Sequence, residues 1–361
     1  MDLYQKISVL GSSAQYDTCG PKDFGKTTNI PGVYHAKVGG TRVCRLFKVL
    51  QTNYCQNNCQ YCAFCRDRSC LRVSAGSEEM AKAFDMVYRK NLVDGLFLSS
   101  GIFGNPDTTM TKLIDTALVL RKKYKFRGYL HLKIMPGASL SCINMVAKLA
   151  NRISLNIESP TEEGLTNLSP EKKLKQGFFY TLSLIKKELK KLKFSGKKIP
   201  SLTTQFIVGA GEEKDRDFIK TTHFLYKNFD LRRVFYSGFR PVANTPFANQ
   251  APSSPVRENR LYQADFLIRF YRFLPWDFSL DNDGNLFKTS DPKFVWAKKN
   301  QDLFPISLNK AGYWDLLRIP GIGPLSAKKI IVLRKHRKIK KFTQLASKRI
   351  LINKLKPFVC F

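Results

Sequence analysis

The sequence predicts an α/β protein, with a parallel sheet flanked by helices and a small all-α domain at the C-terminus. Two observations lead to this prediction. Apolar, strand-like runs alternate six times with longer helical patterns between residues 45 and 274, and a strongly basic helical segment follows from residue 306. Six βα units imply parallel strands joined by right-handed crossovers, and they are too few to close an eight-stranded barrel.

The predicted elements follow one another in a regular order along the chain. The predicted strands are residues 45–52, 95–100, 128–135, 152–158, 202–208 and 233–239. The predicted helices are residues 78–91, 109–125, 140–151, 171–194, 215–228 and 257–274. Ser77 and Pro170 suit helix starts. Residues 1–44 are rich in Gly and polar residues and predict an irregular N-terminal cover segment.

Polarity alternates along two of these strands, residues 128–135 and 152–158. Successive strand residues point to opposite faces, so the apolar face is expected to meet the helices and the polar face to line the inside of the sheet. The polar residues expected there are His131, Lys133, Asn156, Glu158 and Gln205. They predict a polar ligand site, unless they pair with one another in a filled core.

Composition indicates the size of the protein and the charge of its partner. The chain has 361 residues, 43% of them hydrophobic, which is enough for a domain of enzyme size and a small second one. Its 61 Lys and Arg against 28 Asp and Glu give a net charge of +33. This excess favours a polyanion, whose phosphates would be neutralised by the basic side chains. The alternative is that the lysines lie on solvated surfaces and bind no polyanion.

Cysteine usage indicates a metal site and a reducing compartment. The chain has nine cysteines, and five of them fall within residues 55–70, which is typical of a metal site rather than a disulfide framework. There is no run of about 18 apolar residues and no signal-peptide pattern at the N-terminus. We therefore expect a cytoplasmic protein without a membrane partner.

Cys55, Cys59 and Cys62 form the most specific motif of the chain, directly after the first predicted strand. Three thiolates on a four-iron cluster leave one iron without a protein ligand, and an open iron can hold a reactant. Two alternatives remain open. Cys65 could complete a four-ligand zinc site, and Cys59 to Cys70 come near a ferredoxin-type run that lacks the usual final spacing and proline.

With Tyr61 before the third cysteine, the motif closely resembles the signature of the radical S-adenosylmethionine (SAM) enzymes. The resemblance implies a [4Fe–4S] cluster on Cys55, Cys59 and Cys62, whose open iron chelates SAM. It also implies reductive cleavage of SAM to a 5′-deoxyadenosyl radical, with an external electron donor. The fold that it implies is a partial, TIM-like (βα)6 barrel. Cys65 and Cys70 are then expected to be spare thiols.

The same resemblance assigns a SAM site at the carboxyl ends of the strands. Residues 99–101 stand where the family carries a Gly-Gly-Glu-like turn for the SAM amino group, but here the acidic residue is missing. Residues 156–158 stand where the family places ligands of the ribose or carboxylate, and residues 206–212 resemble its adenine-side motif without the first glycine. The implied cofactor-binding residues are Tyr61, Ser99, Ser100, Gly101, Asn156, Glu158, Ile207 and Gly209.

A second motif, residues 314–330, closely resembles the helix-hairpin-helix of DNA repair and replication proteins. Its glycines allow a tight turn, and the turn amides with the following helix N-terminus suit a phosphate. Residues 306–361 hold fourteen Lys and Arg and a single acidic residue, Asp315. The implied nucleic-acid contacts are Gly321, Ile322, Gly323, Lys328 and Lys329. The alternative is a hairpin that binds another protein.

Together the two motifs resemble a family of radical SAM proteins assigned to DNA modification or repair. The resemblance covers nearly the whole chain, including residues 95–101, 130–133, 156–158, 161–165 and 261–265. It implies four parts: a cover segment (1–44), a radical SAM partial barrel (45–280), a linker (281–305) and a DNA-binding domain (306–361). Two alternatives are an enzyme that modifies RNA or tRNA and a non-enzymatic, zinc-stabilised nucleic-acid-binding protein.

Overall fold

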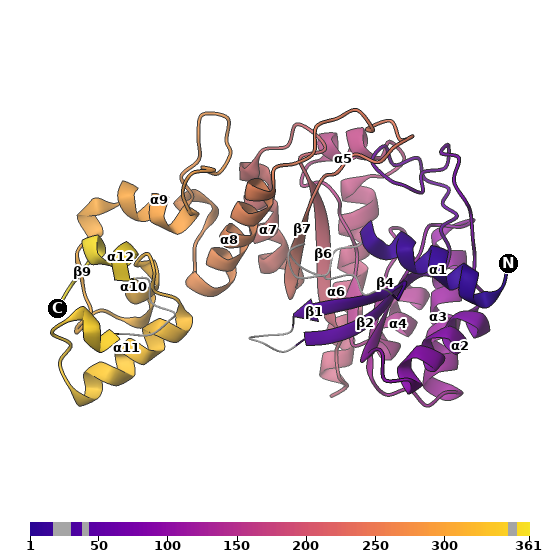
Figure 1. Ribbon diagram of the computed structural model, residues 1–361, viewed down its shortest axis with the longest axis horizontal. Coiled ribbons are helices and arrows are strands. Elements are labelled where there is room, and N and C mark those ends of the chain that lie inside the picture. The colour runs from indigo at the N-terminus through magenta and orange to yellow at the C-terminus, as the bar shows by residue number, and fades with distance from the viewer. Residues whose placement is uncertain (17–29, 38–42, 346–351) are drawn as a thin grey trace. The chain divides into compact units, whose positions relative to one another are not determined.

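The computed structural model describes residues 1–16, 30–37, 43–345 and 352–361. Its centre is a seven-stranded sheet in which neighbouring strands follow the order of the sequence, from β1 to β7 (Figure 1). The first strand pairs antiparallel with the second, and all other pairs are parallel. The strands are β1 Val33–Lys37, β2 Val43–Leu50, β3 Gly95–Ser99, β4 Tyr129–Lys133, β5 Arg152–Ser154, β6 Ser201–Val208 and β7 Arg233–Gly238.

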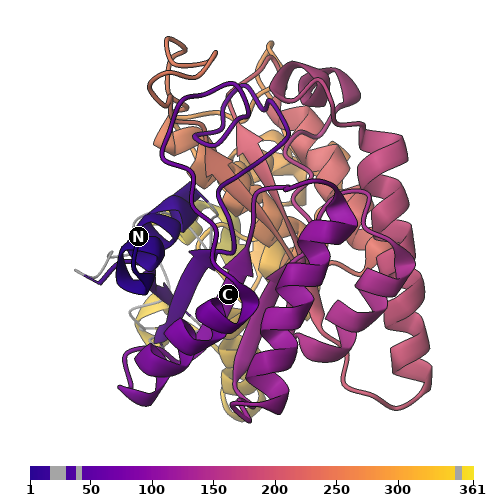
Figure 2. The same cartoon turned by 90° about the vertical axis from the view of Figure 1, so that its right-hand side faces the viewer.

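The six parallel strands confirm the predicted α/β fold with a partial (βα)6 barrel. Each strand lies beside the next one in sequence, so the right-handed crossovers place their helices on the same face of the sheet. The helices that follow β2 to β5 are α2 Ser77–Arg89, α3 Pro106–Lys122, α4 Leu140–Leu149, α5 Glu162–Leu168 and α6 Tyr180–Phe194. Figure 2 shows α2, α3, α4 and α6 side by side over the strands.

Both faces of β4 and β5 are buried, since the polar residues His131 and Ser154 are buried as well as their apolar neighbours. Leu130, Leu132 and Ile153 are fully buried, as expected for residues that meet the helices. On the opposite face His131 stacks on the ring of Phe97, with centroids 4.0 Å apart. Its Nε2 lies 2.9 Å from the hydroxyl oxygen of Ser154. The inner face of the sheet therefore carries polar groups that contact one another.

The N-terminal segment is more regular than predicted. Within residues 1–44 the structure has helix α1 Leu3–Ser13 and strand β1, and residues 17–29 and 38–42 of this segment lie outside the described residues. Helix α1 starts at a capping box, in which the Asp2 carboxylate accepts the Gln5 N–H at 2.8 Å and the Gln5 side chain accepts the Asp2 N–H. The Asp-x-x-Gln spacing is therefore the sequence pattern that marks this helix.

The helix predicted over residues 171–194 begins later, at Tyr180. A π-helical segment, η3 Leu174–Phe179, precedes it, and α5 lies before that. The Glu162 carboxylate accepts the N–H of Leu174 at 3.0 Å. This side chain caps the start of the helical segment at Leu174, and residues 169–173 form an irregular loop before it.

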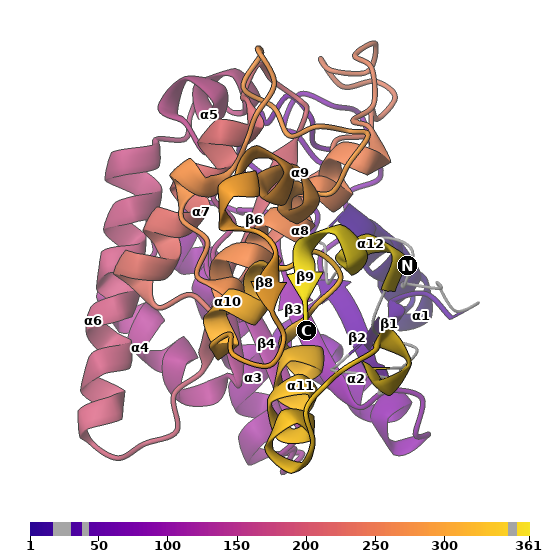
Figure 3. The same ribbon diagram turned by 90° about the vertical axis from the view of Figure 1, so that its left-hand side faces the viewer.

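The chain divides into two compact units. Unit 1 comprises Met1–Glu213 and Phe224–Ser254, and unit 2 comprises Lys214–His223 and Pro255–Phe361. Unit 2 contains α8 Pro255–Tyr271, α9 Pro292–Lys299, α10 Tyr313–Arg318, α11 Pro324–His336, α12 Ile352–Leu355 and the parallel pair β8 Ile306–Ser307 with β9 Val359–Cys360 (Figure 3). The predicted linker 281–305 thus holds a helix, while the predicted four-part division of the chain stays a prediction.

A membrane-spanning helix is not found in the described part of the chain. None of its helices combines the length and the apolar composition that crossing a bilayer requires.

Candidate metal centre and its surroundings

The cysteine loop leaves the carboxyl end of β2 and is fixed first at Cys55. The N–H of Ile102, just past β3, donates to the Cys55 sulfur at 3.5 Å. The N–H of Gln56 donates to the Ile102 carbonyl at 2.8 Å. These contacts place the half-buried Cys55 beside the segment that follows β3. The carboxyl ends of neighbouring parallel strands lie at the same edge of a barrel, which is where Cys55 is found.

The other two cysteines are fixed by the end of α5 and by the loop itself. Cys59 is buried, and its sulfur lies 3.2 Å from the hydroxyl oxygen of Ser169. The Cys62 N–H donates to the Cys59 carbonyl at 3.0 Å, and the Phe64 N–H donates to the Cys62 sulfur at 3.4 Å. The loop is thus held by hydrogen bonds from its own backbone.

Electrostatics bring the three thiols together with a lysine. Burial, followed by the neighbouring thiols of Cys59 and Cys55, raises the pKa of Cys62 well above its usual range, against the N–H of Phe64. Burial lowers the pKa of Lys172, but Cys59, Glu158 and Cys55 outweigh it and raise that pKa above its usual range. The ammonium group of Lys172 therefore lies within reach of two candidate ligands and of the Glu158 carboxylate.

The donor set suits an iron–sulfur cluster. Cysteine thiolates are the usual ligands of such clusters, and a bound metal would deprotonate the Cys62 thiol, which burial otherwise keeps neutral. Among the residues that the structure describes, no three His, Cys, Asp or Glu side chains are grouped so as to share a single metal ion. The three cysteines come from one loop, and a cation stands beside them.

The turn after β3 has no space for a side chain at Gly101. A Cβ atom on Gly101 would lie 2.2 Å from the Tyr54 carbonyl oxygen, so glycine is required there. The Ser100 hydroxyl donates to the Gly101 carbonyl at 2.7 Å. The Ser99 hydroxyl is buried and has no hydrogen-bond partner in the described structure. A buried hydroxyl of this kind fits a polar group of a cofactor.

Glu158 sits at a sharp turn between β5 and β6. Its φ of 70° is left-handed, which is uncommon for a residue other than glycine. Its N–H donates to the Gln205 carbonyl at 3.0 Å, and its carbonyl accepts the Ile207 N–H at 2.7 Å. Asn156 is buried two residues earlier. A backbone held in such a conformation is a mark of functional sites, and here it presents the Glu158 carboxylate toward Lys172.

The cysteine loop also meets the ends of β6 and β7. Tyr61 packs against an apolar cluster that contains Leu168, Ile207, Ala210 and Phe239. Next to Ile207, Gly209 has a φ of 78°, a conformation that favours glycine. The structure therefore brings together Tyr61 and Ile207, which the sequence assigned to the same cofactor from segments far apart in the chain. The cluster forms an apolar wall of the kind that suits a flat ring.

Two elements of this site were missed in the sequence. Lys172 lies in the predicted helix 171–194 and Ser169 lies just before it, so nothing in the sequence marked them as neighbours of the cysteines. Glu213 was also missed. Its Oε1 accepts the Ser159 hydroxyl proton at 2.7 Å, and both residues are buried. The pair ties the start of α5 to the end of β6, and a Cβ on Gly164 would lie 2.2 Å from Glu213.

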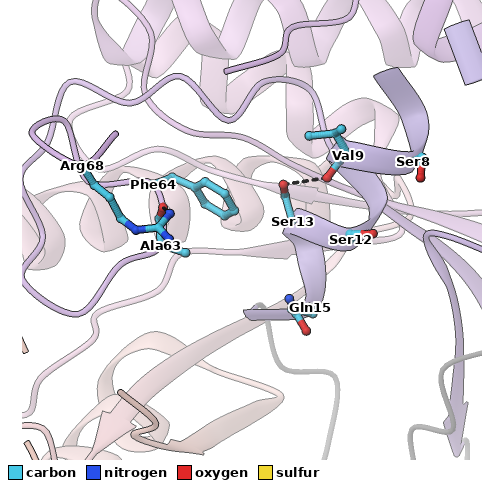
Figure 4. Close-up of a pocket in the computed structure, with 8 residues that line it drawn as sticks. All are labelled: Ser8, Val9, Ser12, Ser13, Gln15, Ala63, Phe64 and Arg68. Carbon is cyan, nitrogen blue, oxygen red and sulfur yellow. Dashed lines mark hydrogen bonds between the residues drawn. The ribbon is translucent and has the colours of Figure 1, made fainter. Parts of the chain in front are cut away.

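A separate pocket of about 370 Å³ lies between α1 and the cysteine loop (Figure 4). The Ser13 hydroxyl and the Arg68 guanidinium that line it are hydrogen-bonded within the protein. Ser13 donates to the Val9 carbonyl at 2.7 Å, and Arg68 donates to the carbonyls of Ala63 and Ala243 at 2.7 and 3.0 Å. We therefore read Arg68 as a brace of the cysteine loop. The lining residues are Ser8, Val9, Ser12, Ser13, Gln15, Ala63, Phe64 and Arg68.

The second motif forms two helices joined by a tight turn within unit 2. Helix α10 ends at Arg318, and helix α11 begins at Pro324 after the N-cap Gly323. Gly321 has a φ of 84°, which favours glycine. Ile322 is buried, and its N–H donates to the Ile319 carbonyl at 3.2 Å. The predicted contact residues Lys328 and Lys329 are exposed on α11.

This turn is braced by helices that precede the predicted C-terminal domain. Lys293 of α9 is buried, and its ammonium donates to the Ile322 carbonyl at 2.6 Å. It also lies over the ring of Tyr271 of α8, 4.7 Å from the centroid. Burial, with a smaller contribution from Arg318 and against Asp291, lowers the pKa of Lys293 to about 7. The turn is therefore part of a larger unit.

Comparison with known proteins finds similar solved structures and nothing at the sequence level. No protein-family model matches the chain, and no curated protein does. The FeFe-hydrogenase maturase HydG from Carboxydothermus hydrogenoformans is 19% identical, with a TM-score of 0.48 over 61% of this chain. Methylornithine synthase (PylB) is 14% identical, with a TM-score of 0.47 over 61%. A radical SAM methyltransferase from Sphaerobacter thermophilus is 13% identical, with a TM-score of 0.46 over 66%.

The chain spans about half the length of HydG, 60% of methylornithine synthase and 72% of the methyltransferase. With TM-scores below 0.5, these likenesses carry no argument about the chemistry of this chain. The functional proposal below rests on its own residues.

Proposed function

We propose that the protein is a radical SAM enzyme in which Cys55, Cys59 and Cys62 hold a [4Fe–4S] cluster. The observation that carries the proposal is the position of the cysteine loop at the carboxyl ends of the strands. There the Cys55 sulfur lies 3.5 Å from the Ile102 nitrogen after β3, and the Cys59 sulfur lies 3.2 Å from the Ser169 hydroxyl oxygen after α5. Lys172 and Glu158 add charged groups to the same site. When bound, such a cluster supplies the electron that cleaves SAM into methionine and a 5′-deoxyadenosyl radical. A separate reductant is needed to deliver that electron.

The residues around the thiols have distinct tasks in this proposal. The Ser99 hydroxyl and the backbone of Gly101 receive the amino group of SAM, in place of the missing acidic residue. The Lys172 ammonium balances the negative charge that the thiolates and the SAM carboxylate bring into a buried site. Tyr61 and Ile207 supply an apolar surface for the adenine ring and keep water away from the radical.

We further propose that unit 2 binds nucleic acid, with DNA as the first candidate and RNA or tRNA as the second. The support is the hairpin turn at Gly321 to Gly323 with exposed lysines on the following helix, in a segment with a large excess of basic residues. A helix N-terminus preceded by a tight turn suits a phosphate. Contacts of this kind position a protein on DNA without reading sequence. A target base buried in a duplex would have to be extruded.

Anaerobic reconstitution tests the enzymatic part. We expect about four irons per chain and formation of 5′-deoxyadenosine from SAM after reduction with dithionite, both lost in Cys55→Ala. Cys70→Ser is the matched control, because this cysteine follows the motif but is not assigned to it. Zinc in place of iron, with no cleavage of SAM, contradicts the proposal and favours a zinc-stabilised binding protein.

Nucleic-acid binding is tested separately at the hairpin. Gly321→Glu with Gly323→Glu is expected to weaken binding of duplex DNA and to flatten its salt dependence, because the added carboxylates repel phosphate. Gly177→Glu with Gly196→Glu is the matched control, since both positions face open space in unit 1 and Gly196 also has a positive φ. Equal binding by both double variants at several salt concentrations contradicts this role. Competition between duplex DNA and tRNA at matched salt separates the two candidates.

A further inference from the structure

Trp276 stands apart from the other two tryptophans of the chain. It is 76% exposed, whereas Trp296 is buried against Phe273 with ring centroids 5.4 Å apart. Trp314 is stacked under the guanidinium of Arg272, 3.7 Å from its centroid. Within the described residues, no ring, cation or hydrogen-bond partner is found for the Trp276 indole. The indole is therefore open to a partner outside the chain.

The backbone that carries Trp276 is braced on both sides. Trp276 is the middle residue of the single 3₁₀ turn Pro275–Asp277, in which Pro275 fixes the first position. The carboxylate of Asp277 accepts the Leu274 N–H at 2.9 Å and closes the turn. The same carboxylate accepts a hydrogen bond from the Arg318 guanidinium at 3.1 Å. The indole is therefore presented from a short, held turn rather than from a loose loop.

This brace ties the ring to the hairpin. Arg318 is the last residue of α10, three positions before Gly321 in the turn proposed to bind phosphate. Arg318 also lies over the ring of Phe273, 4.2 Å from its centroid, which fixes the guanidinium between the two segments. An exposed aromatic ring and a phosphate-binding turn thus share one anchoring side chain within unit 2.

The charge around the ring decides which partner it suits. Residues 255–361 contain 22 Lys and Arg against 8 Asp and Glu. Such an excess attracts phosphates, and a base attached to the same backbone offers a flat π face to an indole. An apolar protein partner or a lipid tail would account for the ring but not for the charge beside it.

We propose that Trp276 is a stacking platform for an unpaired nucleic-acid base next to the hairpin. The proposal rests on the nucleic-acid-binding function proposed above and names the form of its target. The turn at Gly321 to Gly323 holds the backbone, and the indole takes a base that has left its stack. The protein then prefers single strands and duplexes with an unpaired base to fully paired duplexes.

Intrinsic fluorescence tests this on the full-length protein. A single-stranded oligonucleotide, a duplex with one unpaired thymine and the matched full duplex are titrated at fixed salt. We expect the first two to quench part of the tryptophan emission, and Trp276→Phe to lose that part while keeping most of the affinity. Trp276→Ala is expected to weaken single-strand binding about tenfold, the scale of one lost base stack. Tyr4→Ala, a ring with the same 76% exposure in unit 1, is the control and should change nothing.

Three outcomes overturn the proposal. If Trp276→Ala binds the single strand with the affinity and the quenching of the unaltered protein, Trp276 does not lie at the interface. Nucleic-acid binding itself is then left intact. Quenching or a blue shift caused by anionic phospholipid vesicles, but not by oligonucleotides, assigns the ring to a membrane surface. Absence of nucleic-acid binding by the unaltered protein removes both this proposal and the proposed partner, while SAM cleavage still reports on unit 1 by itself.

Discussion

The two units of the molecule use polar groups in opposite ways. In unit 1, the groups that matter are buried: Cys59 beside Ser169, and Glu158 at a strained turn. In unit 2, the basic side chains of Lys328 and Lys329 are exposed. Buried charges are costly and act strongly at short range, whereas exposed charges are screened by salt and act weakly. This contrast is in keeping with the proposals of chemistry in unit 1 and nucleic-acid binding in unit 2.

The largest effect that separates the units is expected from Cys62→Ala. Loss of one of three thiol ligands should abolish 5′-deoxyadenosine formation and lower the iron content after reconstitution. Binding of duplex DNA should stay within about twofold, since distant sites in separate units act independently. Iron content is measured by colorimetric assay and binding by fluorescence anisotropy. Parallel loss of both functions would show that the units are one functional body.

Gly101→Ala should come next in size. The new Cβ would lie 2.2 Å from the Tyr54 carbonyl oxygen, so the turn after β3 must move away from Cys55. We expect the rate of SAM cleavage to fall about a hundredfold, the scale of a misplacement of about 1 Å at a reacting centre. Gly177→Ala, where a Cβ meets nothing within 4 Å, should keep the full rate. Normal cleavage by Gly101→Ala would place the SAM amino group elsewhere.

Lys172→Ala tests the cation beside the thiols. Without the ammonium the site carries uncompensated negative charge, so binding of SAM to the reconstituted protein should weaken about tenfold, as expected for one charged hydrogen bond. Equilibrium dialysis measures the affinity directly, apart from turnover. Lys172→Arg should restore most of it, and Lys173→Ala, which alters an exposed neighbour, should have no effect. An unchanged affinity in Lys172→Ala would limit this residue to packing.

The smallest effect is expected at Lys293 in unit 2, and it depends on pH. Its pKa in the folded chain is lowered to about 7, below the usual value of 10.5 for lysine, because the ammonium is buried. The unfolded chain therefore binds more protons between these values, and stability should rise with pH across this window. The contribution amounts to roughly 2 kcal/mol between pH 7 and pH 9. Thermal unfolding of Lys293→Met should lack this component, and an identical pH dependence in both proteins would refute it.

Much of the sheet could be predicted because its pattern is local. Every predicted strand overlaps an observed one, since apolar runs of this length between helical patterns have few other uses. The cysteine loop and Gly101 were also marked by sequence, and the structure places Cys55 beside the turn that Gly101 opens. Parallel topology explains the remaining proximity, because the carboxyl ends of parallel strands lie at the same edge of the sheet.

What the sequence did not reveal depends on contacts between distant segments. Lys172 lies in an irregular loop, because the helical segment after it begins only at Leu174, whose N–H the Glu162 carboxylate accepts. Likewise, Lys293 supports the hairpin from a stretch that carries no motif and was predicted as a linker. Both contacts join segments that are separated in the chain, and single-sequence patterns do not record such contacts.

Strand β1 has a consequence for the solution behaviour of the protein. An open sheet ends in rows of unsatisfied N–H and C=O groups, which can recruit a strand from another molecule. The antiparallel pairing of Val33–Lys37 with β2 covers the buried, apolar β2 on that side. The new outer strand is only five residues long and ends in Lys37. Short length and a terminal lysine are features that discourage further addition of strands at a sheet edge.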